Sequence, residues 1–430
     1  NLYPVMTLVN GDLIADLEAR NLIHDSTERD YLRTQLAEGS TGVYYGCDPT
    51  ADSLHVGNLI GLVVLRRFQD AGHRAIALAG GATGMVGDPG GRSEERNLLD
   101  EETLTYNVAK IKEQLGRIVD LTDERRGMLV DNRDWTQPIT VLDFLRDVGK
   151  HVTVNQMLAR ESIKVRINSE HGISFTEFSY MLLQANDYLW LYDHLGCTIQ
   201  VGGSDQWGNI ISGVDLIRRK RQAHVHAFSW PLLTSSDGTK LGKTTGARVW
   251  LDPAKTSPYQ FRQHWMQTTD DDVEAQLLTF SLRPVAELRA IAARHAEAPQ
   301  LRLGQKTLAD DMVTLVHGGA AATAANEAAD LLFSKDPTGA SAAAFEILAC
   351  EIPHSRMPVS ELDDTVGVLV ATELAQSNGD ARRTLAQRAF YVNGVQLSEK
   401  DQLSGQKLLH GRYLLLRKGK KSPPLVEIHH

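Results

Sequence analysis

Apolar positions along the first 250 residues change between two spacings, and each change marks the boundary of an element. Runs of consecutive apolar residues predict buried strands, whereas apolar residues three and four apart predict helices. The elements predicted in chain order are a strand at 43–45, a helix at 59–68, a strand at 73–79, a helix at 104–121, a mostly helical stretch at 131–209, and strands at 197–201 and 228–234. The β-α-β order at the start predicts an α/β domain with a Rossmann-like parallel sheet, which binds ligands at the carboxyl ends of its strands.

The pattern changes after Pro253. Helices are predicted at 274–280, 285–298 and 305–317, and an Ala-, Ser- and Gly-rich stretch with a proline near 336–344 is typical of a linker. A small α+β unit follows, with two helices before a hairpin at Asn393-Gly394, the residue pair that most strongly predicts a two-residue turn. The predicted domains are an α/β domain at 6–252 with a helical insertion around 131–195, an α-helical domain at 253–333, a linker at 334–358 and a C-terminal domain at 359–428.

Composition and charge narrow the range of functions. The chain of 430 residues is 42% hydrophobic and 23% charged, as in globular proteins, and no apolar stretch is long enough to span a bilayer. Three scattered cysteines predict neither a disulfide framework nor a zinc site, and they favour a reducing cytoplasm. The net charge of −9 argues against a nucleic-acid partner. However, ten basic and three acidic residues between Asp380 and Lys421 give that segment +7 and leave −16 elsewhere, which keeps nucleic-acid binding open.

Two segments carry groups suited to binding a polyphosphate. His55-Val56-Gly57-Asn58 opens the first helix, where free N–H groups and the positive end of the helix dipole favour phosphate. Lys240 and Lys243 flank a glycine in a polar loop, which suits a mobile arm that closes on phosphates. Each segment has a simpler alternative, since His55 can be a helix cap and the lysines can lie in a solvated loop. A P-loop is excluded because Asp237 stands where its first glycine is required.

Three further groups of polar residues stand at strand ends or on a helix face. Asp88 lies in the most glycine-rich run of the chain, and Gln200–Gln206 forms a turn after a strand. Tyr180, Gln184 and Asp187 stand at i, i+4 and i+7, so they share one face of a largely apolar helix. Because an unpaired buried carboxylate is costly, Asp187 needs either a protein partner or a ligand. Taken singly, each group is compatible with a structural role.

These groups in this order resemble the bacterial tyrosyl-tRNA synthetases, which are class I enzymes. The matching segments are Tyr44–His55, Phe175–Gln184 and Gln200–Asn209, within a resemblance that extends from about Leu13 to Lys421. The resemblance implies that the α/β domain is catalytic, that the domain at 253–333 recognises the anticodon, and that the domain at 359–428 binds RNA, like a module of a ribosomal protein. The implied enzyme activates L-tyrosine with ATP to tyrosyl-adenylate and transfers the tyrosyl group to tRNA(Tyr), as a cytoplasmic homodimer without membrane contact.

The resemblance also implies a role for individual residues, of which Tyr44 and Asp187 bind the tyrosine hydroxyl. The residues implied to bind tyrosine are Tyr44, Asp88, Tyr180, Gln184, Asp187 and Gln206. Those implied to line the ATP site are Tyr45, Gly46, Asp48, His55, Gly57, Asn58, Gly203, Asp205 and Lys243. Those implied to act on the phosphates during catalysis are Thr50, His55, Lys240, Lys243, Arg92 and Arg96. RNA binding is implied at Arg382, Arg383 and Arg388.

The implied chemistry requires no general acid, general base or covalent nucleophile, since the tyrosine carboxylate itself attacks the α-phosphorus. The enzyme positions the reactants and stabilises negative charge that grows in the transition state. Mg²⁺ is expected on the phosphates, and no metal ion is expected on the protein. The sequence departs from the family pattern at three places. Asn58 replaces the second histidine of H-x-G-H, Arg92 replaces a common lysine, and Ser422–Ile428 lacks the usual aromatic pattern, so we interpret it as partly vector-derived, like His429-His430.

Two other functions stay open from the sequence. A tryptophanyl-type synthetase has the same fold, but Tyr44 with Asp187 and the C-terminal module argue against it. A non-catalytic RNA-binding or splicing cofactor derived from a synthetase belongs to another functional class. The presence of His55, Lys240 and Lys243 argues against that second alternative, because a protein without catalysis does not need them.

Overall fold

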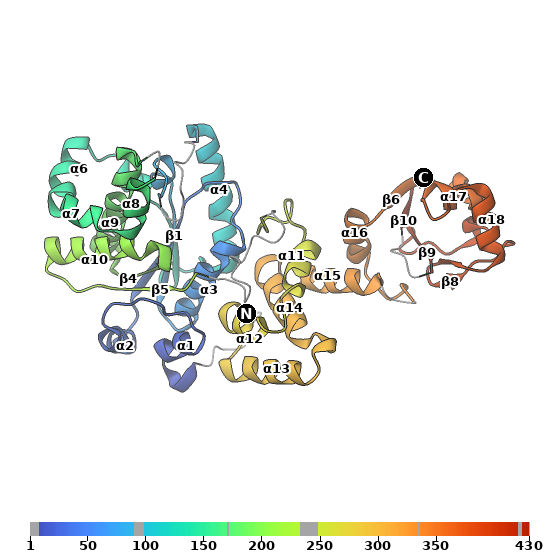
Figure 1. The fold of residues 1–430 in the computed structure, drawn as a ribbon, viewed down its shortest axis with the longest axis horizontal. Coiled ribbons are helices and arrows are strands. Elements are labelled where there is room, and N and C mark those ends of the chain that lie inside the picture. The colour runs from blue at the N-terminus through green and yellow to red at the C-terminus, as the bar shows by residue number, and fades with distance from the viewer. Residues whose placement is uncertain are drawn as a thin grey trace. The chain divides into compact units, whose positions relative to one another are not determined.

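The computed structural model describes residues 8–89, 99–169, 172–232, 248–332, 336–419 and 424–429. Two compact units make up the chain (Figure 1). The first consists of Asn1–Thr256 and His264–Val316, and the second of Ser257–Gln263 and His317–His430. Residues 253–333, which were expected to form one helical domain, therefore contribute to both units.

A five-stranded parallel sheet forms the centre of the first unit, with the strand order β3-β2-β1-β4-β5. Its strands are β1 (Gly42–Cys47), β2 (Arg74–Ala79), β3 (Gly127–Asp131), β4 (Cys197–Gly203) and β5 (His226–Trp230). The predicted parallel α/β architecture is thus confirmed. Because β1 pairs with β2 on one side and with β4 on the other, its carboxyl end is the switch point at which such sheets bind ligands.

Two strands differ from the prediction. No strand was predicted at β3, because Met128, Leu129 and Val130 are only three consecutive apolar residues between polar ones. The last strand was predicted at 228–234, whereas β5 begins at His226, a buried polar residue that interrupts the apolar pattern. Whether either segment is buried depends on the strands beside it in the sheet, and the local sequence carries no information about those strands.

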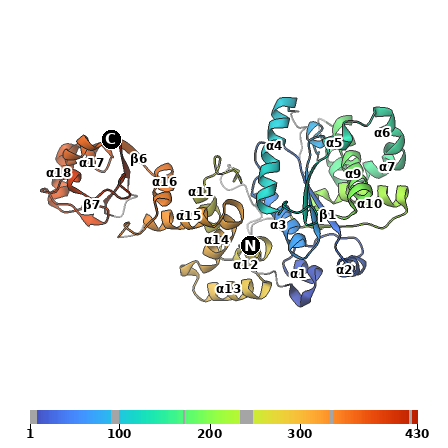
Figure 2. The ribbon, with the colours of Figure 1, turned by 180° about the vertical axis from the view of Figure 1, so that it is seen from behind.

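Helices cover both faces of this sheet (Figures 1 and 2). The helices α3 (Val56–Asp70) and α4 (Glu101–Ile118) lie on one face, and α9 (Phe175–Leu195) and α10 (Trp207–Arg221) lie on the other. Tyr44 belongs to the core beneath α9 and α10. Among the described residues before 200, the other α-helices are α1 (Leu13–Ala19), α2 (Arg29–Glu38), α5 (Arg133–Thr136), α6 (Val141–Asp147), α7 (Val154–Leu158) and α8 (Glu161–Ile167).

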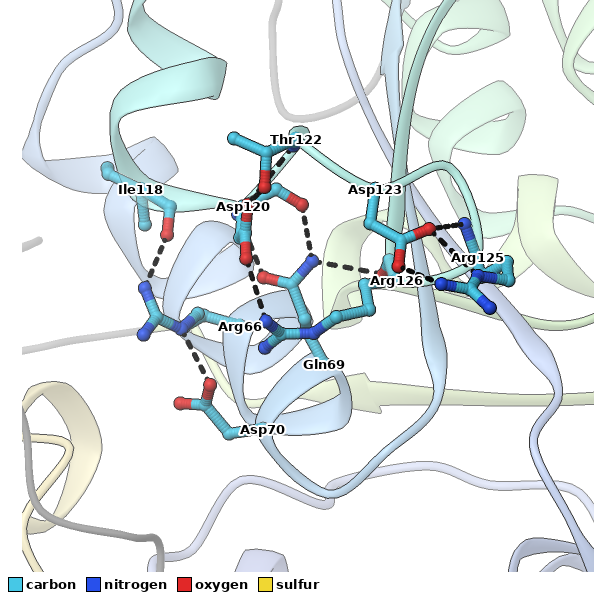
Figure 3. A network of polar contacts seen from close by, with 9 residues as sticks. All are labelled: Arg66, Gln69, Asp70, Ile118, Asp120, Thr122, Asp123, Arg125 and Arg126. Atoms are coloured by element: carbon cyan, nitrogen blue, oxygen red, sulfur yellow. Dashed lines mark hydrogen bonds and ion pairs between the residues drawn. The ribbon is translucent and has the colours of Figure 1, made fainter. Parts of the chain in front are cut away.

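Side chains of α3 hold the loop between α4 and β3 (Figure 3). The amide of Gln69 donates to the carbonyl oxygens of Asp120 at 2.7 Å and Arg126 at 3.0 Å, and its Oε1 accepts from the N–H of Asp120 at 2.8 Å. Arg66 donates to the carbonyl oxygen of Ile118 at 3.0 Å. These bonds fix the chain just before β3, which explains how so short an apolar run becomes the edge strand.

Three helices C-terminal to the sheet also pack in the first unit: α12 (Val273–Phe280), α13 (Val285–Glu297) and α14 (Leu303–His317), the last of these up to Val316. Two buried arginines bind the chain at the end of α12. Arg20 donates to the carbonyl oxygens of Leu278 at 3.1 Å and Ser281 at 3.2 Å, and Arg67 of α3 also donates to that of Ser281. Asp16 pairs with Arg20 at 2.7 Å. Cations at a helix C-terminus are favourable, so this contact attaches α12 to α1 and α3.

The second unit contains a five-stranded sheet with the order β6-β10-β9-β7-β8. Its strands are β6 (His354–Pro358), β7 (Phe390–Val392), β8 (Val395–Gln396), β9 (Tyr413–Lys418) and β10 (Leu425–His429). Its helices are α15 (Gly319–Leu331), α16 (Ala342–Glu351), α17 (Thr365–Ala371) and α18 (Asn378–Ala386), while α11 (Pro258–Met266) begins in this unit. Leu414 and Leu416 share a core with α17 and α18, and Tyr413 and Leu415 share one with α15 and α16.

The structure differs from one expectation in this unit and confirms another. Residues 334–358, which were expected to be a linker, contain α16 and β6, because the second face of the sheet is apolar and needs a helix to cover it. The last strand, β10 at Leu425–His429, pairs with both β6 and β9. The predicted hairpin is present, with φ of 48° at Asn393 and 82° at Gly394, as a two-residue primed turn requires. Among the described residues, no helix combines the length and the apolar character that crossing a membrane requires.

Candidate active site

A cavity of about 360 Å³ opens at the carboxyl ends of β1 and β4, beside the N-terminus of α3. Every residue expected to bind tyrosine or ATP that falls within the described part of the chain lines this cavity. These residues are Tyr44, Tyr45, Gly46, Asp48, Thr50, His55, Gly57, Asn58, Asp88, Tyr180, Gln184, Asp187, Gly203, Asp205 and Gln206. The fold therefore brings together residues as far apart in the sequence as Tyr44 and Gln206.

The positions Arg92, Arg96, Lys240 and Lys243 fall outside the described residues. Arg382, Arg383 and Arg388 lie in the second unit, on or just after α18, and all three are exposed. Arg383 pairs with Asp380 at 2.7 Å.

His55 caps α3 at the mouth of the cavity. Its Nδ1 accepts from the N–H of Gly57 at 3.0 Å, and its own N–H donates to Oδ1 of Asn58 at 3.1 Å, which forms a capping box. A Cβ atom at Gly57 would lie 2.7 Å from Cε1 of His55, so a larger residue at position 57 would have to displace the imidazole. Burial, followed by the charge of Arg248, lowers the pKa of His55 to about 4. The imidazole is therefore neutral near pH 7, and with Nδ1 accepting, its proton lies on Nε2.

The opposite end of the cavity is built around Asp187 of α9. Its Oδ1 accepts from Nε1 of Trp135 at 2.8 Å, and its Oδ2 accepts from Nδ2 of Asn132 at 3.0 Å. Burial raises the pKa of Asp187 to about 7, although these two hydrogen bonds oppose the rise. Within the described residues, the buried hydroxyl of Tyr44 and the Oε1 of Gln184 have no hydrogen-bond partner. Buried polar groups are rarely left unpaired, so this end of the cavity has the properties of a polar ligand site.

A hydrogen-bonded network joins the strands around the cavity. The hydroxyl of Tyr180 donates to Oδ2 of Asp48 at 2.8 Å, and Thr83 donates to Oδ1 of the same carboxylate at 2.7 Å. Asn132 donates to Oγ1 of Thr83 at 2.9 Å and so connects Asp48 with Asp187. On the other side, Asp88 accepts from Nε2 of Gln206 at 2.5 Å and from Nδ2 of Asn209 at 3.4 Å. Within the described residues, no group of three or more His, Cys, Asp or Glu side chains is placed to hold a metal ion.

Comparison with known proteins identifies the family to which this site belongs. Residues 36–334 match class I tRNA synthetases (W and Y), and residues 345–426 match the tyrosine–tRNA ligase SYY-like C-terminal domain. The tyrosine–tRNA ligase of Opitutus terrae is 46% identical over 422 residues, which cover 97% of this chain and 99% of that protein. That of Geobacillus stearothermophilus is 46% identical over 420 residues, which cover 96% and 99%. This chain belongs to the tyrosine–tRNA ligase family.

Solved structures agree with this membership. A C-terminally truncated mitochondrial tyrosyl-tRNA synthetase of Aspergillus nidulans superposes with a TM-score of 0.68 and 33% identity, covering 75% of this chain and 94% of that one. The tryptophanyl-tRNA synthetase of Plasmodium falciparum has a TM-score of 0.53 at 14% identity, covering 71% and 84%, and so shares the fold alone. Membership of the tyrosine–tRNA ligases excludes the tryptophanyl-type alternative, and it makes the protein a class I aminoacyl-tRNA synthetase.

Five residues at the site of this tyrosine–tRNA ligase family member were missed from the sequence: Thr83, Asn132, Trp135, Asn209 and Arg248. Asn132 and Trp135 directly follow β3, the strand that was not predicted, so recognition of that strand would have placed them at the ligand edge of the sheet. Asn209 follows Gln206 by three positions and shares its helix face at the start of α10. Arg248 follows the polar stretch of sequence that carries the two lysines. Its positive charge is the only sequence feature that could have identified it as a site residue.

Proposed function

We propose that the cavity binds L-tyrosine with its phenol ring at the Asp187 end. The substrate hydroxyl donates to Asp187 and accepts from Tyr44, whose hydroxyl is then no longer unpaired. That unpaired buried hydroxyl, close to a carboxylate that already accepts from two fixed donors, is the observation that carries the proposal. A site that pairs a substrate hydroxyl rejects the analogue without one, and tyrosyl-tRNA synthetase is the standard example of this discrimination.

The polar residues in the middle of the cavity receive the amino acid's charged end. The substrate ammonium group lies among Asp88, Tyr180 and Gln184, of which Gln184 has an unpaired Oε1 within the described residues. Tyr180 donates its own proton to Asp48 and keeps lone pairs to accept from the ammonium group. Gln206 is assigned to the carboxylate. A cation among carboxylates and a carboxylate beside an amide are both favourable pairings.

ATP occupies the side of the cavity nearest α3. Tyr45, Gly46, Asp48, Gly57, Asn58, Gly203 and Asp205 line the adenosine and ribose, and Thr50 and the Nε2–H of His55 contact the phosphates. The N-terminus of α3 adds a favourable dipole there. Lys240, Lys243, Arg92 and Arg96 are assigned to the phosphates from the sequence alone. Mg²⁺ enters with ATP, whose phosphates supply the oxygen ligands that the ion prefers.

The reaction then needs no proton transfer in its first step. The tyrosine carboxylate oxygen attacks the α-phosphorus, the bond to the bridging oxygen breaks, and pyrophosphate leaves with that oxygen. The neutral His55 donates a hydrogen bond to the growing negative charge, which is electrostatic stabilisation rather than acid catalysis. In the second step a hydroxyl of the 3′-terminal adenosine of tRNA(Tyr) attacks the carbonyl carbon, the bond from that carbon to the phosphate oxygen breaks, and AMP leaves while the hydroxyl proton passes to its phosphate group or to water.

We assign tRNA binding to the chain after the α/β domain. Residues 253–333 are proposed to recognise the anticodon, and the domain at 359–428 to bind RNA with Arg382, Arg383 and Arg388. The +7 charge between Asp380 and Lys421 supports this proposal, because phosphate neutralisation dominates the affinity of proteins for nucleic acids. The cytoplasm is proposed as the location, in accord with three free cysteines.

A homodimer is proposed through the helical insertion. Exposed apolar side chains concentrate there, including Val141 at 75%, Leu142 at 78% and Phe175 at 77% relative exposure. A second copy would remove this apolar surface from water, which is the usual reason for such a patch. The variant Phe175→Asp should lower the dimer fraction in analytical ultracentrifugation, and an unchanged dimer fraction would place the interface elsewhere.

Tyrosine-dependent exchange of pyrophosphate into ATP tests the proposed function. The protein with Mg²⁺ should catalyse exchange with tyrosine, without tRNA, and neither phenylalanine nor tryptophan should replace tyrosine. Exchange with tryptophan would show that the amino-acid site has been assigned wrongly. Absence of exchange with any amino acid would refute the assignment of the cavity to tyrosine and ATP.

A further inference from the structure

A short backbone bridge connects Trp250 with His55 at the start of α3. In this antiparallel bridge the N–H of Val56 donates to the carbonyl oxygen of Val249 at 3.0 Å. The N–H of Trp250 donates to Oγ1 of Thr256 at 3.0 Å. The indole ring meets the imidazole of His55 edge-on, with 6.3 Å between the ring centroids. Main-chain bonds therefore hold the Trp250 ring beside His55, at the nucleotide side of the cavity.

Two cations lie on the Trp250 ring, and they differ in their other contacts. Cζ of Arg248 is 5.7 Å from the ring centroid, and Nζ of Lys255 is 5.5 Å from it, distances at which an indole attracts a cation. Lys255 pairs with Asp52 at 2.8 Å and does not line the cavity. Arg248 lines the cavity, and it forms no ion pair or hydrogen bond with another residue in the described part of the chain.

Arg248 brings positive charge to a cavity that is otherwise acidic. Among the described residues that line the cavity, Arg248 is the one with a permanent positive charge, whereas four carry a carboxyl group: Asp48, Asp88, Asp187 and Asp205. His55 adds no charge near pH 7, because burial and then the charge of Arg248 lower its pKa to about 4. A triphosphate carries several negative charges. Of the described lining residues, Arg248 is thus the one whose charge can offset them.

We propose that Arg248, supported by the ring of Trp250, binds the triphosphate of ATP and the pyrophosphate that forms from it. The inference rests on the proposed function, in which the phosphates lie beside His55. A guanidinium presents several N–H donors in one plane, which suits phosphate oxygens, and stacking on an aromatic ring leaves those donors available. Trp250 is a positioning residue, because it acts through Arg248.

Equilibrium binding in the full-length protein tests the role of Arg248. Isothermal titration calorimetry gives the Kd of ATP with Mg²⁺, of adenosine and of tyrosine for the parent, Arg248→Gln and Arg248→Lys. Arg248→Gln should raise the Kd of ATP about 10-fold, the lower end of the range for a hydrogen bond to a charged group, because Arg248 is exposed. The Kd values of adenosine and tyrosine should stay within twofold, and Arg248→Lys should recover most of the ATP affinity. An unchanged Kd of ATP, or equal losses for ATP and adenosine, would overturn the proposal.

Lys255→Gln is the matched control. It also removes one exposed cation from the Trp250 ring, but that cation is paired with Asp52 and lies outside the cavity lining. The Kd of ATP should therefore stay within twofold in this variant. A loss as large as that in Arg248→Gln would show that ATP senses the general charge of this surface, which would overturn the specific assignment to Arg248.

A double-mutant cycle tests the support that Trp250 gives to Arg248. Trp250→Leu should raise the Kd of ATP by about 2- to 5-fold in the parent, the range expected for one exposed cation–π contact. It should raise the Kd no further in Arg248→Gln, because the ring acts through the guanidinium. The same increase in both backgrounds would contradict the positioning role of Trp250.

These binding measurements need neither tyrosine nor catalysis, so they separate this inference from the proposed function. Tyrosine-dependent pyrophosphate exchange is measured on the same parent protein. A parent that binds ATP, loses affinity in Arg248→Gln and shows no exchange would refute the proposed function and confirm the role of Arg248. Normal exchange in the parent, together with an unchanged Kd of ATP in Arg248→Gln, would refute the assignment of Arg248 alone.

Discussion

Asp187 should make the stability of the first unit depend on pH, and Asp187→Asn should remove that dependence. Burial raises the pKa of this carboxyl from 3.8 to about 7 in the folded protein. The folded state therefore keeps a proton that the unfolded state loses above about pH 4, so stability falls as pH rises from there to about 7. A difference of about three pKa units corresponds to about 4 kcal/mol in all, of which about 2 kcal/mol falls between pH 5.5 and 8.

Urea unfolding at several pH values, followed by tryptophan fluorescence without substrate, measures this effect. All six tryptophans lie in the first unit, so the signal reports on that unit. The free energy of unfolding of Asp187→Asn, relative to the parent, should increase by about 2 kcal/mol between pH 5.5 and 8 and stay constant above pH 8. The test uses the change of this difference in unfolding free energy with pH and not its absolute value. The absolute value also includes the effect of the introduced amide, which turns an N–H group toward Trp135 or Asn132. Asp30→Asn on the exposed face of α2 controls for the loss of one charge. A difference that does not vary with pH would refute the reasoning.

Three other changes test separate parts of the proposed function. Tyr44→Phe should lower kcat/KM for tyrosine by about 2- to 13-fold without lowering that for phenylalanine, and equal losses would indicate a structural role. Lys240→Ala and Lys243→Ala should each lower the rate of adenylate formation in single-turnover kinetics, and a large rise in the tyrosine Kd instead would contradict their placement on the phosphates. Arg382→Ala combined with Arg388→Ala should reduce the slope of log K against log salt for tRNA binding by about 2, since each phosphate contact contributes about 0.9. An unchanged slope would remove these arginines from the interface.

Local sequence patterns predicted the elements whose burial repeats with a regular period. The helix at 59–68 and the hairpin at Asn393-Gly394 are present because apolar spacing and a turn that requires positive φ are local properties. The sequence-based predictions were wrong for segments whose structure is determined by a neighbouring element of the fold. β3 becomes a strand because Gln69 and β2 hold it, and α16 forms in the expected linker because one face of the C-terminal sheet needs a cover.

In the candidate site, too, some features could be predicted from the sequence and others depend on neighbouring elements. Resemblance to a family named the residues that line the cavity, but it did not give the contacts among them. Asp187 illustrates this, since the sequence left a protein partner and a ligand open as alternatives, and the structure supplies two protein donors while Tyr44 stays unpaired within the described residues. Both of those donors follow β3, so one missed strand hid the partners of the most buried carboxylate in the cavity.

The two ends of the cavity differ in chemistry, and this difference suits the proposed first step, in which no proton is transferred. At the Asp187 end, burial holds carboxyl groups and hydroxyls in a fixed hydrogen-bonded network, which we propose pairs with the phenol and the ammonium group of tyrosine. At the His55 end, burial lowers the pKa of the imidazole, which lines the cavity and is neutral near pH 7. A charged imidazolium there would bind ATP and its transition state alike, whereas a neutral, preorganised donor costs no desolvation of a charge and strengthens as the phosphate charge grows. The low pKa of His55 is thus an expected property of a site that stabilises charge and transfers no proton.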